Sequence, residues 1–185
     1  ARVQRIKDGR DGAESPNNVG GRRAHPPRPS KVWARRMNVR ERRLARNSAL
    51  GATADPELVR SRGHRFGDSV KLPLVVSDEL QKMERTKEVL AALESLGLYD
   101  DLVRADHGKH VRAGRGKRRG RRYRVPRSVL IVVSRKEGIQ KAGANLTGVQ
   151  IVETSRLSTE DLAPGGDPGR LTVYTRSAIE SMGGW

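Results

Sequence analysis

Four short runs of apolar residues set the tightest limit on how this chain of 185 residues can fold. They are KLPLVVS at 71–77, SVLIVVS at 128–134, VQIVE at 149–153 and LTVYT at 171–175. Such runs, rich in valine and isoleucine, are typical of strands that are buried on both faces. Both faces of a strand are buried when helices cover the two sides of a sheet.

Helical signals separate these runs. Leucines at helical spacing predict one helix that Asp78 caps and that continues to Gly97. Shorter helices are predicted over 139–144 and 158–162, and from the last apolar run to about Met182. Because strands and helices alternate, the sequence predicts an α/β fold with a mostly parallel sheet covered by helices. In such a sheet, functional loops are expected at the carboxyl ends of the strands.

Regular structure is predicted to begin near Asn38, which with Glu41 resembles a helix-start capping box. Asp55 and Pro56 predict a second, short helix that ends near Gly63. In the first of these helices one face is expected to present arginines outward, and another face is shared by Leu44, Ala45, Ser48 and Ala52.

The net charge of +17 is concentrated in two segments. Residues 110–126 hold eight Lys and Arg and no acid, and residues 1–36 hold ten against three acids. The rest of the chain is nearly balanced. Charge that served only solubility would be spread out, so the two segments indicate a polyanionic partner such as nucleic acid.

The stretch GRGKRRGRRYRVP from Gly114 to Pro126 does not fit a nucleotide phosphate loop. Gly116-Lys117 is followed by Arg118 where that loop has Ser or Thr, and the stretch precedes a strand instead of following one. A free charged loop gains nothing from cations that repel one another, whereas a phosphate backbone releases counterions when it is neutralised. The stretch therefore favours contact with nucleic acid through backbone and shape.

Residues 1–32 contain no leucine and no aromatic residue, and glycines and prolines interrupt them throughout. Such a segment cannot bury enough apolar surface to offset its ordering entropy, so we expect an extended, mobile arm. The expected organisation is an arm over 1–36 and a globular α/β domain over 37–185 that carries the basic loop 110–126. The chain lacks a starting Met, so the gene is expected to begin earlier.

Several kinds of site are disfavoured. The absence of cysteine excludes disulfides and thiol chemistry, and no run approaches the roughly 20 apolar residues of a membrane span. His107 and His110 are spaced like a metal pair, but the cations beside them oppose Zn²⁺. Acid pairs at 100–101 and 160–161 lie at helix starts, where they offset free N–H groups. Asp78 follows a strand, where either capping or catalysis would place it. No cofactor, metal or small-molecule substrate is expected.

Two aromatic residues lie among the cations, and each has two possible interpretations. Tyr123 either stacks on a base or packs at the entrance of the following strand, and Trp33 either stacks on RNA or anchors the arm to the domain. The full set of predicted binding residues is Arg2, Arg5, Lys7, Arg22, Arg23, His25, Arg28, Trp33, Arg35, Arg36, Arg112, Arg115, Lys117, Arg118, Arg119, Arg121, Arg122, Tyr123 and Arg124.

Four phrases carry a resemblance to a known family. GGRRAHPPRP at 20–29, NSALGATAD at 47–55, AGRGKRRGRRYRVP at 113–126 and EDLAPGGDPGRLTVYTRSAIE at 160–180 are similar to the L4 family of large-subunit ribosomal proteins. The likeness is to the archaeal and eukaryotic branch, and Leu-Ala-Pro-Gly-Gly points to its archaeal side. It runs collinearly over about residues 1–182, although residues 8–19 match the family pattern poorly.

The resemblance implies a structural constituent of the large ribosomal subunit in the cytoplasm, bound to large-subunit rRNA and neighbouring ribosomal proteins, with no membrane partner. It also implies a long loop that reaches through rRNA toward the nascent-peptide exit tunnel, with residues 1–32 as its returning half. The outgoing half and the family's first strand and helix are expected to lie outside this sequence. The alternatives are an α/β enzyme that modifies or cleaves RNA, and a regulatory RNA binder that acts off the ribosome.

Overall fold

The computed structural model describes residues 2–3, 12–13, 16 and 21–183 of a chain that separates into two units, Ala1–Arg36 and Met37–Trp185. In the first unit, β1 (Arg2–Val3) pairs antiparallel with β2 (Gly12–Ala13). Residues 21–36 contain neither helix nor strand. The sequence did not predict the short ladder, because its residues show no strand periodicity.

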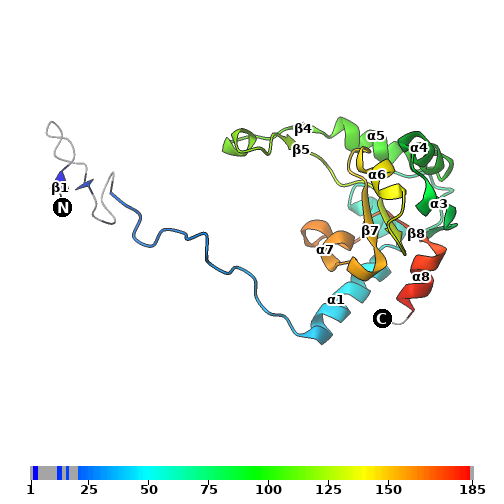
Figure 1. The fold of residues 1–185 in the computed structure, drawn as a ribbon, viewed down its shortest axis with the longest axis horizontal. Coiled ribbons are helices and arrows are strands. Elements are labelled where there is room, and N and C mark those ends of the chain that lie inside the picture. Colours follow the sequence, from blue (N-terminus) through cyan, green and yellow to red (C-terminus); the bar gives the residue numbers. More distant parts are fainter. Residues whose placement is uncertain (1, 4–11, 14–15, 17–20, 184–185) are drawn as a thin grey trace. The chain divides into compact units, whose positions relative to one another are not determined.

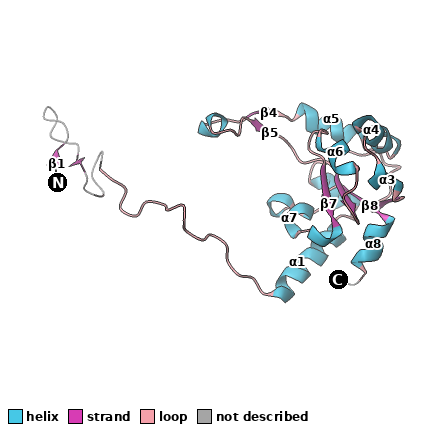
Figure 2. Ribbon diagram, in the orientation of Figure 1, coloured by secondary structure: helices cyan, strands magenta, loops and turns pink. Residues whose placement is uncertain are grey.

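The second unit is built on a parallel sheet that helices surround (Figures 1 and 2). The sheet has four strands in the order β3-β8-β6-β7. One row across this sheet consists of Leu74, Val173, Ile131 and Ile151. All four predicted strands and the predicted parallel sheet are therefore confirmed. Their bounds are β3 (Leu74–Val76), β6 (Leu130–Val133), β7 (Gln150–Glu153) and β8 (Thr172–Thr175).

Strand β6 shows why its sequence is apolar throughout. Ile131 and Val133 pack into one core cluster, and Leu130 and Val132 pack into a second cluster on the other face. Each such buried side chain stabilises the fold by about 1.5–3 kcal/mol. The first cluster includes residues of α2 (Pro56–Ser61), α3 (Glu79–Lys82), α4 (Thr86–Ser95), α5 (Tyr99–His107) and α6 (Ile139–Ala144). The second includes residues of α1 (Val39–Ala52), α7 (Thr159–Leu162) and α8 (Arg176–Met182).

The prediction of one helix over 78–97 is wrong, because the chain forms two. Helix α3 ends at Lys82, Met83 adopts an extended conformation, and α4 begins at Thr86. The loop before α6 lies against this break, where a Cβ on Gly138 would meet the carbonyl oxygens of Lys82 and Met83 at 3.2 and 3.1 Å. Both helices contribute to the same core cluster, so their leucines keep a helical spacing across the break.

Helix α1 follows Asn38 as predicted, but the Asn38 side chain does not cap it. The predicted sharing of a face by Leu44 and its neighbours does not lead to burial, since Leu44 is 71% exposed and Ala49 is the buried residue. Thr53 follows the last turn of α1, and its Oγ1 lies 2.9 Å from the hydroxyl of Tyr174. The earlier turns of α1 also lie against the domain, because they line a hollow together with Leu157, Ser158 and Thr159. The α1 residues of this hollow are Val39, Arg42, Arg43 and Arg46.

Two predicted helix starts are confirmed in detail. The Asp55 side chain accepts hydrogen bonds from the backbone N–H groups of Glu57 and Leu58 at the start of α2. At α7, Ser158 and Asp161 form a reciprocal capping box. The short helix predicted over 139–144 is also confirmed as α6.

Candidate RNA-binding surface

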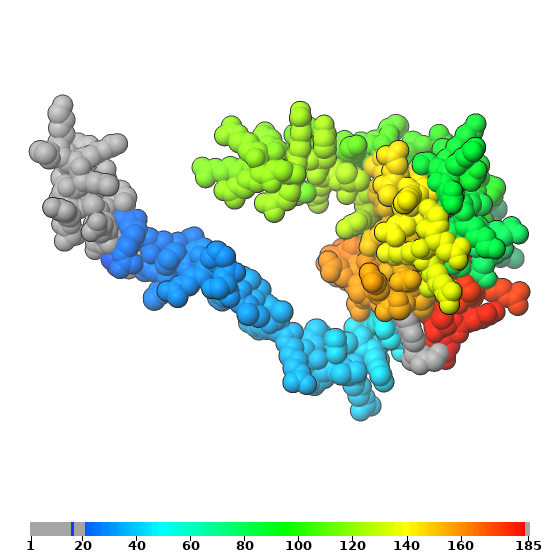
Figure 3. Space-filling model, in the orientation of Figure 1, coloured from blue at the N-terminus to red at the C-terminus, as the bar shows by residue number. Residues whose placement is uncertain are grey.

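The basic loop folds as a two-stranded hairpin that projects from the sheet domain (Figure 3). Strand β4 (His110–Val111) pairs antiparallel with β5 (Tyr123–Arg124). One further bond extends the ladder, since the backbone N–H of Arg112 donates to the carbonyl oxygen of Arg122 over 2.8 Å. The segment is thus a defined structure rather than an irregular loop.

The tip of the hairpin is a 3-10 turn, η1 (Arg115–Arg118), between two glycines at positive φ. Gly114 and Gly120 have φ values of 75° and 76°, a conformation that costs glycine little. The backbone N–H groups of Arg119 and Arg121 both donate to the carbonyl oxygen of Gly116, over 3.1 and 3.2 Å. Backbone bonds alone close the turn, so the charged side chains are left to point outward.

All eight cations of residues 110–126 have exposed side chains. Within the described part of the chain, none of them forms a salt bridge with an acid. Cations held this close without counter-charges repel one another and attract a polyanion. They are Arg112, Arg115, Lys117, Arg118, Arg119, Arg121, Arg122 and Arg124.

Tyr123 lies on β5 with 49% of its surface exposed. The Lys109 ammonium is 5.3 Å from the centre of its ring, and the Arg122 guanidinium carbon is 5.6 Å away. The ring belongs to neither core cluster. An exposed ring beside two cations is compatible with base stacking, which stays a prediction.

In the first unit, Trp33 is 74% exposed and the Lys31 ammonium lies 4.7 Å from its ring centre. Two predicted binding residues, Arg5 and Lys7, lie outside the described residues, and of Arg2 only the backbone, in β1, is described. The remaining predicted residues of this unit have exposed side chains: Arg22, Arg23, His25, Arg28, Arg35 and Arg36.

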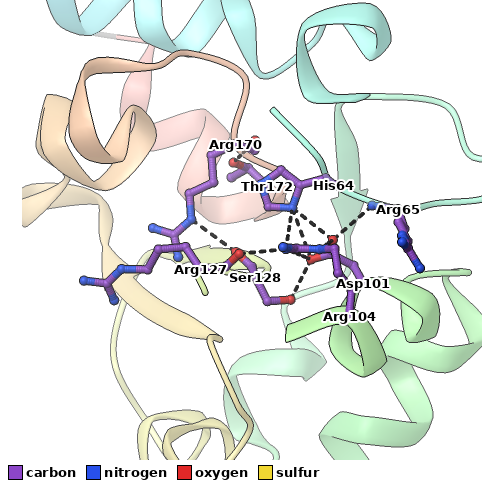
Figure 4. A network of polar contacts seen from close by, with 8 residues as sticks. All are labelled: His64, Arg65, Asp101, Arg104, Arg127, Ser128, Arg170 and Thr172. Carbon is purple, nitrogen blue, oxygen red and sulfur yellow. Dashed lines mark hydrogen bonds and ion pairs between the residues drawn. The ribbon is translucent and has the colours of Figure 1, made fainter. Parts of the chain in front are cut away.

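A buried carboxylate fixes the base of the hairpin (Figure 4). Asp101, in the first turn of α5, has no exposed surface. It accepts hydrogen bonds from Ser128 Oγ at 2.7 Å, Arg104 Nε at 2.8 Å and the Arg65 backbone N–H at 3.0 Å, and His64 Nδ1 lies 3.1 Å from it. Asp101 thereby ties α5, which leads into the hairpin, to Ser128, which follows it.

The carboxylate of Asp101 is charged in the folded protein. Burial by itself raises the pKa of Asp101, but hydrogen bonds from His64, Arg104 and Ser128 outweigh burial and hold that pKa well below its usual range. The sequence identified Asp101 only as a first-turn acid, a position that α5 confirms. Its hydrogen-bond partners lie up to 37 residues away along the chain, so no local sequence pattern could have revealed this hydrogen-bond network.

Asp78 caps a helix, but not the helix predicted from the sequence, which was the one that follows Asp78 directly. Its Oδ1 accepts from the backbone N–H and the hydroxyl of Ser177, at 3.0 and 2.6 Å, and from Gln81 Nε2 at 3.0 Å. Asp78 therefore caps α8 and makes no side-chain cap at α3. The hydrogen bonds from Ser177 hold the pKa of Asp78 below its usual value, which does not suit a proton-transferring acid.

The two histidines with metal-like spacing lie apart from any acid cluster. His107 ends α5, and His110 Nδ1 lies 2.9 Å from the carbonyl oxygen of Gly108. Among the described residues, no group of three or more His, Cys, Asp or Glu could hold a metal ion. None of the helices formed by the described residues has the length and apolar character needed to cross a bilayer.

The basic hairpin precedes a strand of the sheet, as its position in the sequence indicated. It leads directly into β6, and therefore stands at the amino end of that strand. The carboxyl ends carry Asp78, Gln81 and Ser177, which bond to one another. Functional loops at the carboxyl ends of the strands stay a prediction.

An α/β domain with an acid-free basic hairpin defines a class of protein that binds a polyanion over an extended surface.

Comparison with known proteins is consistent with this class. The model of the ribosomal protein L4/L1 family matches residues 1–185. Large ribosomal subunit protein uL4 of Haloquadratum walsbyi is 52% identical over 167 residues, which are 90% of this chain and 66% of that protein. The uL4 of Archaeoglobus fulgidus is 51% identical over 185 residues, which are 100% of this chain and 73% of that protein.

The chain belongs to the ribosomal protein L4/L1 family. It spans about two thirds to three quarters of the length of these two relatives. Membership of this family confirms the class of protein predicted from the four sequence segments. That class is a structural, non-enzymatic constituent of the large ribosomal subunit with archaeal relatives. Family membership does not support the RNA-modifying or RNA-cleaving alternative.

Proposed function

We propose that the basic hairpin, residues 110–126, binds large-subunit rRNA by neutralising its phosphates. One observation carries this proposal, the projection of eight exposed cations without a single acid among them. Seven of the eight are arginines, whose planar guanidinium groups donate paired hydrogen bonds to phosphate oxygens. Each neutralised phosphate releases counterions, so the repulsion within the free hairpin becomes a driving force for binding.

The arm extends the same interaction. Residues 21–36 have exposed cations and no helix or strand that would hold them in one conformation. A segment of this kind takes its ordered conformation from the partner that neutralises it. The proposed role of the arm is therefore to order along rRNA, in the direction of the exit tunnel that the family resemblance implies. Neighbouring ribosomal proteins are further proposed partners.

Competition binding to a transcript of the large-subunit rRNA tests the role of the hairpin. The test variant replaces four hairpin cations, Arg118→Gln, Arg119→Gln, Arg121→Gln and Arg122→Gln. The matched control removes the same charge from exposed lysines of the sheet domain, Lys71→Gln, Lys82→Gln, Lys87→Gln and Lys141→Gln. Thermal melting of both variants verifies that the domain still folds.

We expect the hairpin variant to lose at least about tenfold in affinity, because charge-assisted hydrogen bonds to phosphate are lost. The lysine control should stay within about threefold, since exposed charges farther than a Debye length from the RNA are largely screened. Equal losses in the two variants would show that net charge, and not the hairpin, determines binding.

A further inference from the structure

A polar hollow of about 720 Å³ lies at the base of the hairpin, beside the amino end of β6. We call it the arginine hollow. Its charged and titratable lining residues are Arg62, His64, Arg104, Arg124, Arg127 and Asp167. They come from the end of α2 and the loop after it, from α5, from the return strand of the hairpin and the segment after it, and from the loop before β8. Only Arg124 belongs to the binding residues predicted from the sequence.

The positive charge that lines the arginine hollow exceeds the negative charge. Four guanidinium groups face it with one carboxylate, that of Asp167. The Arg62 guanidinium donates to backbone carbonyl oxygens, those of Asp167 and, over 2.6 Å, Pro164. Arg104 is paired with the buried Asp101. The guanidinium groups of Arg124 and Arg127 form no hydrogen bond or ion pair with any residue that the structure describes.

A fifth arginine adds positive charge next to the arginine hollow. Arg170 is fully buried and donates to the carbonyl oxygen of Ser128 at 3.2 Å, and to Gln150 Oε1 and the carbonyl oxygen of Asp161 at 2.8 Å each. All three acceptors are neutral, and its buried Nη2 has no partner among the described residues. Burial, and then the charge of the neighbouring Arg127, lower the pKa of Arg170 to about 10 (Figure 4).

The carboxylates of Asp161 and Asp101 form no ion pair with Arg170, and their charges raise its pKa without outweighing burial. A buried cation without a directly bonded carboxylate is costly, and a further nearby anion reduces that cost. The hollow therefore has the properties of an anion site: unpartnered forked donors at its rim, an excess of positive charge, and a buried cation beside it. A phosphate group matches these donors best, since its oxygens accept paired hydrogen bonds from guanidinium groups.

We propose that the arginine hollow binds one phosphate group of an RNA strand that continues onto the hairpin. Arg124 belongs both to the hairpin and to the rim of the hollow, so a strand lying along the hairpin reaches the hollow without a break. Arg124 and Arg127 donate to the phosphate oxygens, and Arg62 and Arg104 contribute charge while they keep their structural bonds. This inference rests on the proposed function and adds a defined phosphate position to it.

The test compares two arginines on either side of one strand. Arg127 precedes β6 and lines the hollow, whereas Arg135 follows β6 at the other end, and both side chains are exposed. Arg127→Gln and Arg135→Gln therefore remove the same charge from exposed positions at the two ends of one strand, only one of which lies at the hollow. Binding of the whole chain to the large-subunit rRNA transcript is measured at several salt concentrations for the wild type, both variants and the four-site hairpin variant.

We expect Arg127→Gln to weaken binding about tenfold and to reduce the steepness of the log–log salt dependence by about 0.7, the value for one phosphate on single-stranded RNA. Arg135→Gln should change neither. If Arg127→Gln behaves like Arg135→Gln while the hairpin variant loses binding, the hollow is not a phosphate site and the proposed function stands. If the hairpin variant also binds normally, both proposals fail.

A second measurement identifies the source of the phosphate. Inorganic phosphate is added to wild-type complexes at constant ionic strength, with sulfate-free chloride as the control. For a site that holds RNA, millimolar inorganic phosphate should displace no more RNA than chloride does. Arg127-dependent binding of phosphate to these complexes without any release of RNA would show that free phosphate occupies the hollow beside the RNA, which would overturn the assignment to an RNA strand.

Discussion

Arg104 donates from Nη2 to the carbonyl oxygen of Arg127 over 2.8 Å, while its Nε donates to Asp101 over 2.8 Å. The same side chain thus joins the buried carboxylate to the segment between the hairpin and β6. Ser128 adds a second connection, from its hydroxyl to Asp101. Folding of the domain and presentation of the hairpin are therefore coupled through Asp101.

Replacing this carboxylate should weaken the fold strongly. Asp101→Asn leaves Arg104 and His64 without their charged partner, and removing one member of a buried charge pair costs about 3–5 kcal/mol. The expected result is a clear fall in the melting temperature and in the urea midpoint. The control is Asp100→Asn, the exposed neighbour in the same turn of α5, which should change stability by less than about 0.5 kcal/mol. Similar melting of the two variants would contradict the role of the network.

The same residue predicts a dependence of stability on pH. The folded pKa of Asp101 is depressed below its unfolded value of about 3.9, so its contribution is complete above that value and is lost as the pH falls toward the folded pKa. Urea unfolding of the wild type and of Asp101→Asn at pH 6, 4 and 3 measures this contribution. The difference between the two proteins should be largest at pH 6 and shrink below about pH 4. A difference that grows on acidification would have the wrong sign for this account.

The exposed ring of Tyr123 gives a prediction about base stacking. Tyr123→Ala should weaken rRNA binding by about 1–3 kcal/mol, the usual range for loss of an aromatic ring that stacks on a base. Tyr123→Phe keeps the ring and should bind like the wild type. Filter binding of the three proteins to the same transcript measures this difference in affinity. Wild-type affinity of Tyr123→Ala would contradict base stacking and favour packing of Tyr123 at the strand entrance.

The arm predicts a change in amide exchange on binding. Residues 21–36 have no backbone pairing in a helix or strand, so their amides should exchange without protection in the free protein. On the rRNA they should become protected, while amides of β6 stay protected in both states. Exchange followed by mass spectrometry provides the measurement. Strong protection of 21–36 without RNA would contradict ordering by the partner.

The parts of the fold that the sequence predicted correctly are those with local signals. Strand β6 is apolar at every position because both its faces are covered, and Asp55 and Ser158 cap the helices that follow them. The break at Met83 escaped prediction because two helices that pack on the same core keep one leucine spacing. The exposure of Leu44 escaped it because periodicity shows a face and not what covers that face.

The candidate surface was predictable to a different degree. A run of Lys and Arg without Asp or Glu identified the hairpin, because these residues are close together in the sequence. The arginine hollow was missed because Arg62, Arg127 and Arg170 are distant in sequence and meet only in the folded domain. Arg170 in particular precedes an apolar strand and has no local feature that marks it as buried.

Salt dependence of rRNA binding by the wild-type chain tests the central claim most directly. If the eight cations of the hairpin each neutralise one phosphate of single-stranded or irregular RNA, a plot of log affinity against log salt concentration should have a slope at least as steep as about −5 to −6, and contacts of the arm add to it. The slope of the four-site hairpin variant should be shallower by about 3. A wild-type slope near zero would contradict phosphate neutralisation as the basis of binding.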